Sequence, residues 1–392
     1  MSKMMDTYAR QPVTFEKGEG VWLWAKDGKK YLDALSGVAV NGLGHKHPKL
    51  IKAINEQISR LIHVSNVYHI AEQERLAEKL TAISHMDNVF FCNSGCEANE
   101  AAIKLARLFG HQKSIDTPEI IVMEKAFHGR TMATLSATGN RKTQAGFEPL
   151  VGGFIRVAFD DLEAIQQIAS RKNNVVAILV EPIQGEGGIN IPSNIQNYLK
   201  GLRAVCDEHD WLLMFDEVQS GIGRTGKWFA HQHTSVQPDV MTLAKGLGSG
   251  VPIGACLAKG KASKVFTPGK HGSTFGGNPL ATAAGYATLT IIKEDKLCSH
   301  ASKMGVLINE EFTKHLKDCP QVKVIRNLGL MIGIELDHPC GDLTKLALNE
   351  GLLINVTAEK VIRLLPPLVI NDLEAKELAE RLSQVIKNFL VK

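Results

Sequence analysis

Several features that mark membrane, secreted and nucleic-acid-binding proteins are absent from this chain of 392 residues. No apolar run approaches the roughly 20 residues that a membrane helix needs, and the first ten residues lack the apolar segment of a secretory signal. Charges of the two signs are nearly balanced at a formal net charge of +4, and no basic cluster stands out. We therefore expect no membrane and no nucleic acid among the partners, which leaves small molecules and other copies of the chain.

Cysteine is sparse, and its spacing argues against two common kinds of structural site. The seven cysteines are odd in number and include no C-x-x-C pair, unlike a disulfide framework or a structural zinc site. His231 and His233 form an isolated H-x-H, and no H-E-x-x-H is present, so we interpret these histidines as part of a solvated loop. We expect a protein without a metal ion, located in a reducing cytoplasm.

What is present is the pattern of an α/β protein. The first part predicts a hairpin with strands over Val21–Ala25 and Lys30–Ala34, joined at Asp27-Gly28. Helices are predicted over Pro48–Leu61 and Gln73–Ile83.

Short apolar runs then alternate with helical patterns. The runs cover Val89–Cys92, Ile120–Met123, Val175–Val180, Trp211–Phe215 and Val240–Ala244, and the helical patterns include Glu97–Leu108, Leu162–Ser170 and Ile195–Cys206. Continuous apolar strands separated by helices predict a mainly parallel central sheet covered on both faces.

From about Ala281 the pattern of predicted elements changes to that of a smaller α+β domain. A long helical stretch is followed by strands near Val322–Ile325 and Leu330–Leu336 and by a helix over Leu373–Phe389. We expect an N-terminal segment, residues 1–45, that packs with the small domain, a large domain over 46–285, and a C-terminal small domain over 286–392.

Polar or glycine-rich sequence follows each of the five predicted strands. These segments are Asn93–Cys96, Phe127–Arg130, Glu181–Gly188, Asp216–Gln219 and Lys245–Gly248. Because ligands of open α/β sheets bind beyond the carboxyl ends of the strands, we expect all five segments to meet in one crevice.

Residues in three of these segments suggest a chemistry. Ser94 and Gly95 precede a helix whose first N–H groups can hold an anion such as phosphate, although Ser94 can equally be a simple N-cap. Asp216, at the end of a buried strand, needs a partner, either a protonated ring nitrogen or backbone N–H groups. Lys245 would have a lowered pKa suited to Schiff-base formation, unless its side chain reaches past the strand end to water. Their shared crevice favours the chemical interpretation of both.

Several blocks of the sequence resemble the class-III aminotransferases, in the order in which that family has them. The blocks are Ser94–Asn99, Phe127–Thr131, Glu181–Gly188, Asp216–Gln219 and Ala244–Gly246. Two further regions, His271–Pro279 and Leu353–Val356 with Val361–Pro367, are most similar to the acetylornithine aminotransferases within that family. The resemblance spans nearly the whole chain.

The resemblance implies a fold-type-I transferase that binds pyridoxal 5′-phosphate and forms a homodimer with active sites at the subunit interface. In such an enzyme Lys245 holds the cofactor covalently and moves a proton, while Asp216 pairs with the ring nitrogen. The remaining cofactor contacts implied are Gly95 and Cys96 at the phosphate, Phe127 and Val218 on the two ring faces, Gln219 near the ring hydroxyl, and Thr274 from the partner subunit at the phosphate.

The resemblance also implies how substrates are held. Arg130 would bind a substrate carboxylate, with Ser273 of the partner subunit reaching toward the substrate. Arg363 would be a second carboxylate clamp, and Glu186 would mask it while the amine donor is bound. The alternative is that Arg363 is an ordinary surface arginine.

The implied reaction moves the terminal (omega) amino group of N-acetylornithine to 2-oxoglutarate by a ping-pong mechanism. Its products are N-acetylglutamate 5-semialdehyde and glutamate, as in arginine biosynthesis. Ornithine aminotransferases carry a tyrosine in the stretch that matches Ser36–Gly44, and none occurs here, which favours an acylated donor. Succinylornithine, N-succinyl-diaminopimelate, ornithine and 4-aminobutyrate stay open as donors.

One motif favours a different class of enzyme. Gly221–Gly226 matches the G-x-G-x-x-G of nicotinamide-dependent oxidoreductases and follows a strand. That fingerprint requires a helix directly after it, and the next residues show no apolar stripe at helical spacing. We therefore predict a loop at this position, and the oxidoreductase is the weaker hypothesis.

Overall fold

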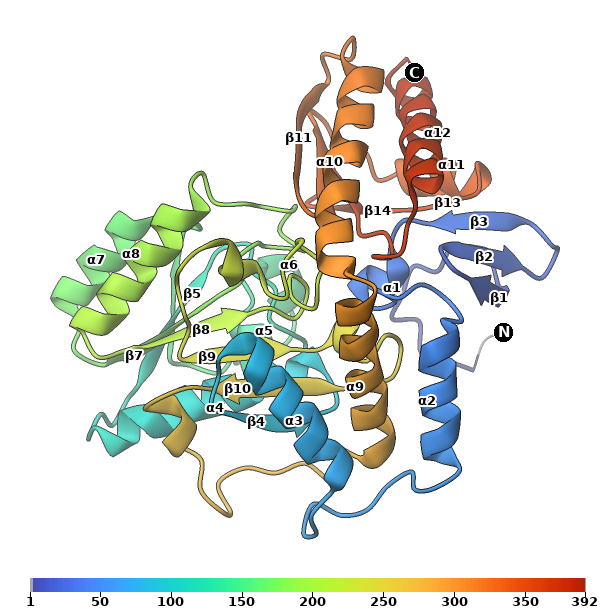
Figure 1. Ribbon diagram of the computed structural model, residues 1–392. Helices are drawn as coiled ribbons and strands as arrows, with labels where there is room; N and C mark the ends of the chain where they lie inside the picture. Colours follow the sequence, from blue (N-terminus) through green and yellow to red (C-terminus); the bar gives the residue numbers. More distant parts are fainter. Residues whose placement is uncertain (1–2, 392) are drawn as a thin grey trace.

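A seven-stranded sheet forms the centre of the larger lobe of the molecule in Figure 1. The computed structural model describes residues 3–391. The strand order is β4-β10-β9-β8-β7-β5-β6, and within the described residues β10 alone runs opposite to the other strands of this sheet. The strands are β4 (Asn88–Cys92), β5 (Glu119–Met123), β6 (Phe154–Val157), β7 (Val175–Val180), β8 (Leu212–Asp216), β9 (Val240–Leu243) and β10 (Gly254–Ala258).

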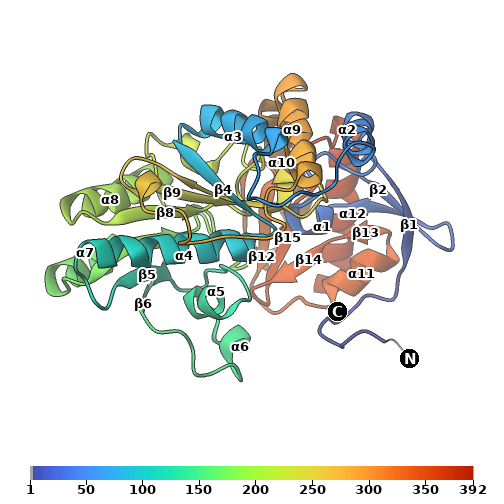
Figure 2. The same cartoon turned by 90° about the horizontal axis from the view of Figure 1, so that it is seen from below.

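Helices cover both faces of this sheet because its strands are apolar on both faces. All six residues of β7 are buried. Alternate residues of β7 pack against α4 (Gly95–Gln112) on one face and against α7 (Leu162–Arg171) and α8 (Ile195–Glu208) on the other. Figure 2 shows α4 along the opposite side of the sheet from α3 (Ala71–Ser84) and α9 (Pro279–Glu294). The carboxyl ends of the parallel strands are therefore the open edge.

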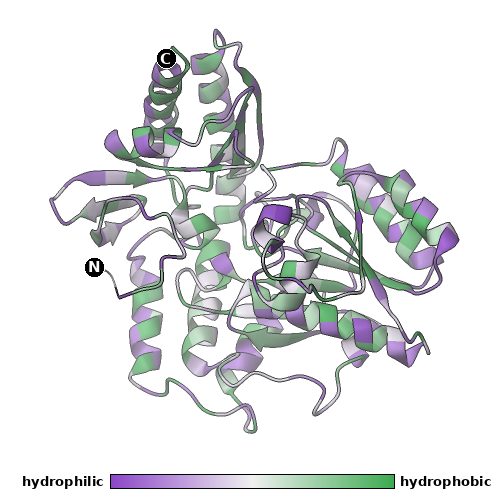
Figure 3. Ribbon diagram, turned by 180° about the vertical axis from the view of Figure 1, so that it is seen from behind, coloured by the Kyte–Doolittle hydropathy of each residue, from purple (hydrophilic) through white to green (hydrophobic). Residues whose placement is uncertain are grey.

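The smaller lobe contains two four-stranded sheets. The first, in the order β11-β12-β15-β14, is antiparallel and is covered by α10 and α12, which lie side by side in Figure 1. Figure 3 shows mixed hydrophobic and hydrophilic residues along these helices, as expected where one side faces a core and the other faces water. The elements of this lobe are α10 (Leu297–Leu316), β11 (Val322–Leu328), β12 (Met331–Leu336), α11 (Leu343–Asn349), β13 (Leu352–Leu353), β14 (Asn355–Thr357), β15 (Val361–Leu364) and α12 (Asp372–Leu390).

The second sheet joins the two ends of the chain. It has the order β1-β2-β3-β13, with β1 (Phe15–Glu19), β2 (Trp22–Ala25) and β3 (Lys30–Asp33) forming an antiparallel unit. The last pair is parallel, and it places Leu32 opposite Leu352. The remaining short elements are α1 (Ser36–Ala39), α2 (Pro48–Ile58), α5 (Met132–Ala137), α6 (Arg141–Gln144), and the 3-10 turns η1 (Ala230–His233), η2 (Lys245–Leu247) and η3 (Ala262–Lys264).

The turn labelled α1 is left-handed. The φ angles of Ser36, Gly37, Val38 and Ala39 are 52°, 61°, 65° and 63°, a conformation that costs a residue other than glycine about 1–2 kcal/mol. Asp33 Oδ1 holds it in place by accepting the N–H of Ser36 at 2.8 Å. The turn packs against η2, so it fixes the chain next to the strand end that carries Lys245.

A buried arginine links the two lobes. Arg224, from the loop after β8, is 3% exposed, and its Nη1 donates to the carbonyl oxygens of Leu330 at 3.2 Å and Pro366 at 2.5 Å. The backbone N–H of Leu330 donates to the Arg224 carbonyl in return, at 2.9 Å. Burial lowers the pKa of Arg224 to about 9. The lobes are thus joined through main-chain atoms as well as through packing.

The mainly parallel sheet, the helices on both its faces and the smaller α+β part confirm the predicted fold class. The sequence pattern misses β1, β6 and β10 and, in the smaller lobe, the short strands β13, β14 and β15. β1 is largely polar, β6 is a short edge strand, and β10 contains small residues with weak strand propensity. The predicted long helical stretch divides at Lys296, whose φ is 53°. The domain boundaries at 45 and 285 stay predictions. Within residues 3–391, every helix is too short or too polar to span a membrane.

Candidate active site

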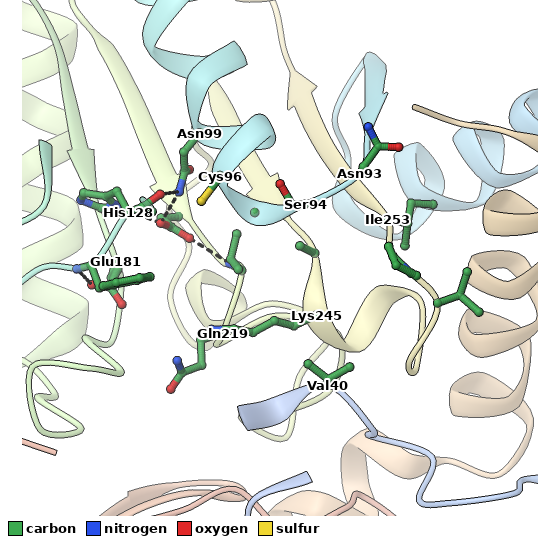
Figure 4. A pocket seen from close by; sticks show the side chains of 18 of the residues that line it. Val40, Asn93, Ser94, Cys96, Asn99, His128, Glu181, Gln219, Lys245 and Ile253 are labelled. Atoms are coloured by element: carbon green, nitrogen blue, oxygen red, sulfur yellow. Dashed lines mark hydrogen bonds and ion pairs between the residues drawn. The ribbon is translucent and has the colours of Figure 1, made fainter. Parts of the chain in front are cut away.

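A cavity of about 360 Å³ opens at the carboxyl ends of the strands (Figure 4). All five polar segments expected from the sequence contribute to its lining. The lining residues from those segments are Asn93, Ser94, Gly95, Cys96, Phe127, His128, Gly129, Glu181, Asp216, Val218, Gln219 and Lys245. Val40, just after the left-handed turn, Asn99, Ala244 and Gly250–Ile253 complete the wall. The single crevice predicted from the strand ends is therefore present.

Asp216, the last residue of β8, presents a carboxylate to this cavity although only 4% of the residue is exposed. Its Oδ2 accepts hydrogen bonds from Asn99 Nδ2 at 2.7 Å and from His128 Nδ1 at 2.8 Å. Its Oδ1 accepts the N–H of Val218 at 3.0 Å. Three donors thus converge on this buried carboxylate, and a cationic group in the cavity would meet an acceptor that is already fixed in place.

Lys245 follows β9 and begins η2 with its backbone in the left-handed region at φ 42°. Burial lowers the pKa of its amine to about 8, assisted by the positive charge of Arg363 and opposed by the carboxylates of Asp216 and Glu181. A lysine with such a pKa is partly neutral near physiological pH, and a neutral amine can attack a carbonyl carbon. The predicted lowering of the pKa is confirmed in direction.

The cavity also contains the beginning of α4. Ser94 is the N-cap, and its side chain accepts the N–H of Glu97 at 3.2 Å. The N–H groups of Gly95 and Cys96 lie in the first helical turn, where they have no partner within the helix. A Cβ at Gly95 would lie 2.8 Å from Val218 Cγ1, so glycine is needed for this close approach. Capping and anion binding are therefore compatible here.

Two loops beside the cavity are fixed by one buried carboxylate. Glu181 accepts the N–H of Phe127 at 2.8 Å through Oε1 and the N–H of Gly185 at 3.1 Å through Oε2. Burial, and then the negative charge of Asp216, raise the pKa of Glu181 to about 7. Gln219 packs so closely on Gly185 that a Cβ there would lie 2.2 Å from Gln219 Oε1. That oxygen is buried without a hydrogen-bond partner within residues 3–391.

The two arginines expected to bind substrate lie in different surroundings. Arg363 on β15 is 1% exposed, and its Nη1 donates to Glu186 Oε2 at 2.8 Å while its Nε donates to Asn355 Oδ1 at 3.0 Å. The alternative of a surface arginine is therefore wrong for Arg363. Arg130 is exposed, with its guanidinium carbon 5.7 Å from the centre of the Phe127 ring. Neither arginine lines the main cavity.

A second cavity of about 500 Å³ adjoins the first. It shares Phe127 with the first cavity and contains Glu186, whose side chain is 44% exposed. The carbonyl oxygen of Glu186 accepts a hydrogen bond from the hydroxyl of Thr357. This bond ties the Glu186 loop to the β14–β15 hairpin, so the carboxylate can move while its backbone stays fixed.

Ser273 and Thr274 do not line either cavity of this chain. The Ser273 hydroxyl accepts Asn93 Nδ2 at 3.2 Å, and Thr274 is exposed on the same loop. The neighbouring Phe275 is 61% exposed. Side chains exposed in this way are available to another molecule.

The cavity combines a carboxylate, a lysine with a lowered pKa and a helix N-terminus, and comparison with known proteins agrees with that chemistry. Residues 4–386 match the aminotransferase class-III family. The chain belongs to the class-III aminotransferases. It is 61% identical over 390 residues to the acetylornithine aminotransferase of Nitrosomonas europaea, which covers 100% of this chain and 99% of the relative. It is 47% identical to that of Aquifex aeolicus over the full length of both.

Solved structures of class-III aminotransferases are similar over almost the same length. The ornithine aminotransferase from Toxoplasma gondii has a TM-score of 0.95 at 34% identity, with 99% of this chain and 93% of that chain covered. The acetylornithine aminotransferase from Elizabethkingia anophelis has a TM-score of 0.89 at 37% identity, with 98% and 96% covered. These likenesses confirm the predicted family and fold.

Class-III aminotransferases depend on pyridoxal 5′-phosphate, and a related Toxoplasma gondii enzyme is described with this cofactor at its active site. The cavity of this chain fits such a group. Asp216 supplies a carboxylate for a protonated ring nitrogen, Lys245 an amine for an aldehyde, and the start of α4 an anion site for phosphate. The buried, unpartnered Gln219 Oε1 is a polar atom that lacks a partner without the ligand.

Sequence reasoning missed the residues that support Asp216 and misjudged one pair of histidines. Asn99 and His128 contact Asp216 from α4 and from the loop after β5, and no local pattern marks either one. His231 and His233 were expected in a solvated loop, yet His231 is 2% exposed, and its Nδ1 lies 3.0 Å from Glu217 Oε1. The buried carboxylate of Glu217 requires donors, which accounts for the difference. No cluster of three or more metal-ligand side chains occurs within the described residues.

Proposed function

We propose that this enzyme transfers the terminal amino group of N-acetylornithine to 2-oxoglutarate, forming N-acetylglutamate 5-semialdehyde and glutamate. The observation that carries the proposal is the buried Arg363, paired with a carboxylate that is itself half-exposed. One site must accept a donor with a single carboxylate and an acceptor with two. A clamp that can be covered or uncovered meets that requirement.

Four side chains would hold and move the reacting groups. When bound, pyridoxal 5′-phosphate supplies the electron sink that stabilises negative charge on the substrate carbon. Lys245 Nζ would hold the cofactor and carry a proton to and from the carbon next to the reacting amine. Asp216 would keep the ring nitrogen protonated. Phe127 and Val218 would fix the plane of the ring.

The remaining positions would fix phosphate, ring hydroxyl and substrate. The N–H groups of Gly95 and Cys96 would bind phosphate, and Gln219 would bind the ring hydroxyl. Arg130 would clamp the donor carboxylate bidentately. Glu186 would cover Arg363 in the first half-reaction and release it when the 1-carboxylate of 2-oxoglutarate arrives.

The chain next to the lysine loop supports an acylated donor. Val40 lines the cavity, and the left-handed turn of Ser36–Ala39 before it presents no tyrosine hydroxyl or charge. An apolar wall of this kind suits an amide-capped amine end better than a free ammonium group. The relatives of highest identity named above are acetylornithine aminotransferases, which supports the same donor.

We infer that the active site is completed in a homodimer. Thr274 and Ser273 line neither of the two cavities described above, and apolar side chains near them are exposed, among them Val67 at 79%, Tyr68 at 67% and Phe275 at 61%. Exposed apolar residues gathered in this way are typical of an interface. Thr274 would then bind the phosphate of the partner subunit's cofactor, and Ser273 would face the partner subunit's substrate.

Subunit mixing tests the shared site. Lys245→Ala and Thr274→Ala homodimers should each be impaired, because every site in them lacks one of the two residues. Mixed dimers contain one site with both residues intact, so purified mixed dimers should have about half the wild-type activity, and a randomly re-associated mixture about a quarter. Absence of any recovery in proven mixed dimers would contradict shared sites.

A panel of donors tests the reaction itself. N-acetylornithine should give the highest kcat/KM with 2-oxoglutarate, measured by glutamate formation, ahead of succinylornithine, N-succinyl-diaminopimelate, ornithine and 4-aminobutyrate. The Toxoplasma gondii likeness makes ornithine the second candidate. A higher kcat/KM for ornithine than for N-acetylornithine would contradict the proposed donor.

The seven free cysteines also support a reducing, cytoplasmic location.

A further inference from the structure

A histidine that the proposed reaction does not use contacts Asp216, the carboxylate that would pair with the ring nitrogen of the cofactor. His128 follows the ring-stacking Phe127 in sequence, and its Nδ1 lies 2.8 Å from Asp216 Oδ2. Its side chain is fully buried. Figure 4 shows it on the side of the cavity away from Lys245. Its imidazole is therefore placed to act on Asp216.

The neighbouring amide decides which atom of this pair carries the hydrogen. Asn99 Oδ1 accepts the hydroxyl of Thr242 at 2.7 Å, and Asn99 Nδ2 donates to the carbonyl of His128 at 2.8 Å. The Nδ2 end is thereby fixed toward Asp216 Oδ2, which it also contacts at 2.7 Å. Oδ2 is thus an acceptor, and His128 Nδ1 must carry a hydrogen to complete the contact.

The two carboxylate oxygens of Asp216 have different hydrogen-bond partners. Oδ2 is used by Asn99 and His128, whereas Oδ1 accepts a single N–H, from Val218. Oδ1 is therefore the oxygen with spare capacity for a protonated ring nitrogen. The His128 backbone is fixed as well, because its N–H donates to Thr138 Oγ1 at 3.0 Å.

His128 also affects a second buried carboxylate near the cavity, that of Glu181. Asp216 and Glu181 are both buried carboxylates, and the negative charge of Asp216 raises the pKa of Glu181. His128 counters that effect, because its charge lowers the pKa of Glu181. His128 Nε2 is buried without a hydrogen-bond partner within residues 3–391. All of its polar contact is thus directed at the carboxylate.

We propose that His128 is a positioning residue whose Nδ1–H bond holds the Asp216 carboxylate turned so that Oδ1 meets the cofactor ring. The proposal depends on the class-III cofactor site and is independent of which amine donor the enzyme prefers. Loss of the bond should weaken cofactor binding and make the bound ring nitrogen easier to deprotonate.

Three substitutions of His128 distinguish the effect of losing the hydrogen bond from the effect of losing the volume of the side chain. His128→Asn keeps an N–H donor close to the position of Nδ1 and can preserve the bond. His128→Phe keeps the ring but has no donor, and His128→Gln places its donor near the position of Nε2 instead. The matched control is His231→Phe, which removes another buried histidine whose Nδ1 contacts a carboxylate, Glu217, outside the cavity.

The readouts do not depend on turnover alone. We would measure the dissociation constant of pyridoxal 5′-phosphate from the apoenzyme, the pH titration of the visible absorption of the holoenzyme, and the half-reaction with L-glutamate. His128→Phe and His128→Gln should raise the dissociation constant at least about tenfold, since a charge-assisted hydrogen bond is lost. They should shift the spectral titration and lower the half-reaction rate constant about tenfold, with the concentration of glutamate at half-saturation unchanged.

His128→Asn should stay within about threefold of the wild type in each measurement. His231→Phe should lower the thermal midpoint without shifting the spectral titration. The proposal is overturned if all His128 variants keep the wild-type affinity and titration, or if His128→Asn is impaired as much as His128→Phe, because packing would then explain the loss. If His128→Phe does not fold, the comparison of His128→Gln with His128→Asn decides.

Discussion

Replacing Glu186 should change which substrates the enzyme prefers. The substitution Glu186→Gln keeps the shape of the side chain and removes the charge that faces Arg363. If Arg363 and Arg130 bind substrate carboxylates as proposed, a carboxylate must displace Glu186 before it can bind Arg363, whereas a donor bound at Arg130 need not. The variant should therefore favour L-glutamate and 2-oxoglutarate over N-acetylornithine.

The structure sets the size of this effect. Arg363 Nη1 and Glu186 Oε2 are 2.8 Å apart, and the arginine side chain is 2% exposed. A hydrogen bond to a charged group contributes about 1.5–3 kcal/mol, and the 44% exposure of Glu186 favours the lower end because water screens it. About 1.5 kcal/mol corresponds to roughly a tenfold change in an equilibrium constant. The ratio of kcat/KM for glutamate to that for N-acetylornithine should rise by about this factor.

Single-turnover absorbance measurements of the two donor half-reactions give that ratio directly. Glu359→Gln is a suitable control, because Glu359 lines the same second cavity but pairs with Lys142. It should leave the ratio unchanged. The reasoning is refuted if Glu186→Gln changes the ratio less than twofold, or if both variants change it equally.

Other consequences of the geometry can be measured on the apoenzyme. The rate of cofactor capture should rise about tenfold per pH unit up to about pH 8 and then level off, because the lowered pKa of Lys245 leaves its amine neutral above that pH. Stopped-flow absorbance measures this rate, and a continued rise to about pH 10 would show that the amine is unperturbed. Gly95→Ala should weaken cofactor binding about tenfold in a fluorescence titration, since its Cβ would lie 2.8 Å from Val218 Cγ1, and unchanged affinity would mean that Val218 moves freely. Arg224→Met should lower the free energy of unfolding in urea by about 2–4 kcal/mol, because two buried carbonyl groups lose their donor; a loss under 1 kcal/mol would show that water replaces it.

The strand ends of the large sheet were predictable because parallel strands share one open edge. Five polar segments placed after apolar runs were enough to predict that Asp216 and Lys245 meet. The two arginines were harder, since Arg363 lies on an antiparallel strand of the smaller lobe and its burial depends on contact with Glu186. Only the family resemblance connected that pair.

The supports of Asp216 were not predictable from local sequence. Asn99 and His128 are 117 and 88 residues away from it, and an asparagine in a helix or a histidine in a loop has many ordinary uses. Their role arises from a tertiary arrangement in which three elements converge on one carboxylate. Patterns of hydrophobicity describe which faces are buried, but they do not say which buried polar groups meet.

The parallel pairing of β3 with β13 has a consequence for synthesis on the ribosome. Leu32 lies opposite Leu352 in this sheet, so β3 meets its partner strand only after about 320 further residues have been made. At roughly 5–20 residues per second, that interval lasts about 15–65 s. Throughout it, the nascent hairpin has an unpaired edge that can join another strand. Ribosome-bound chains shorter than about 350 residues should therefore depend on chaperones more than the finished protein does.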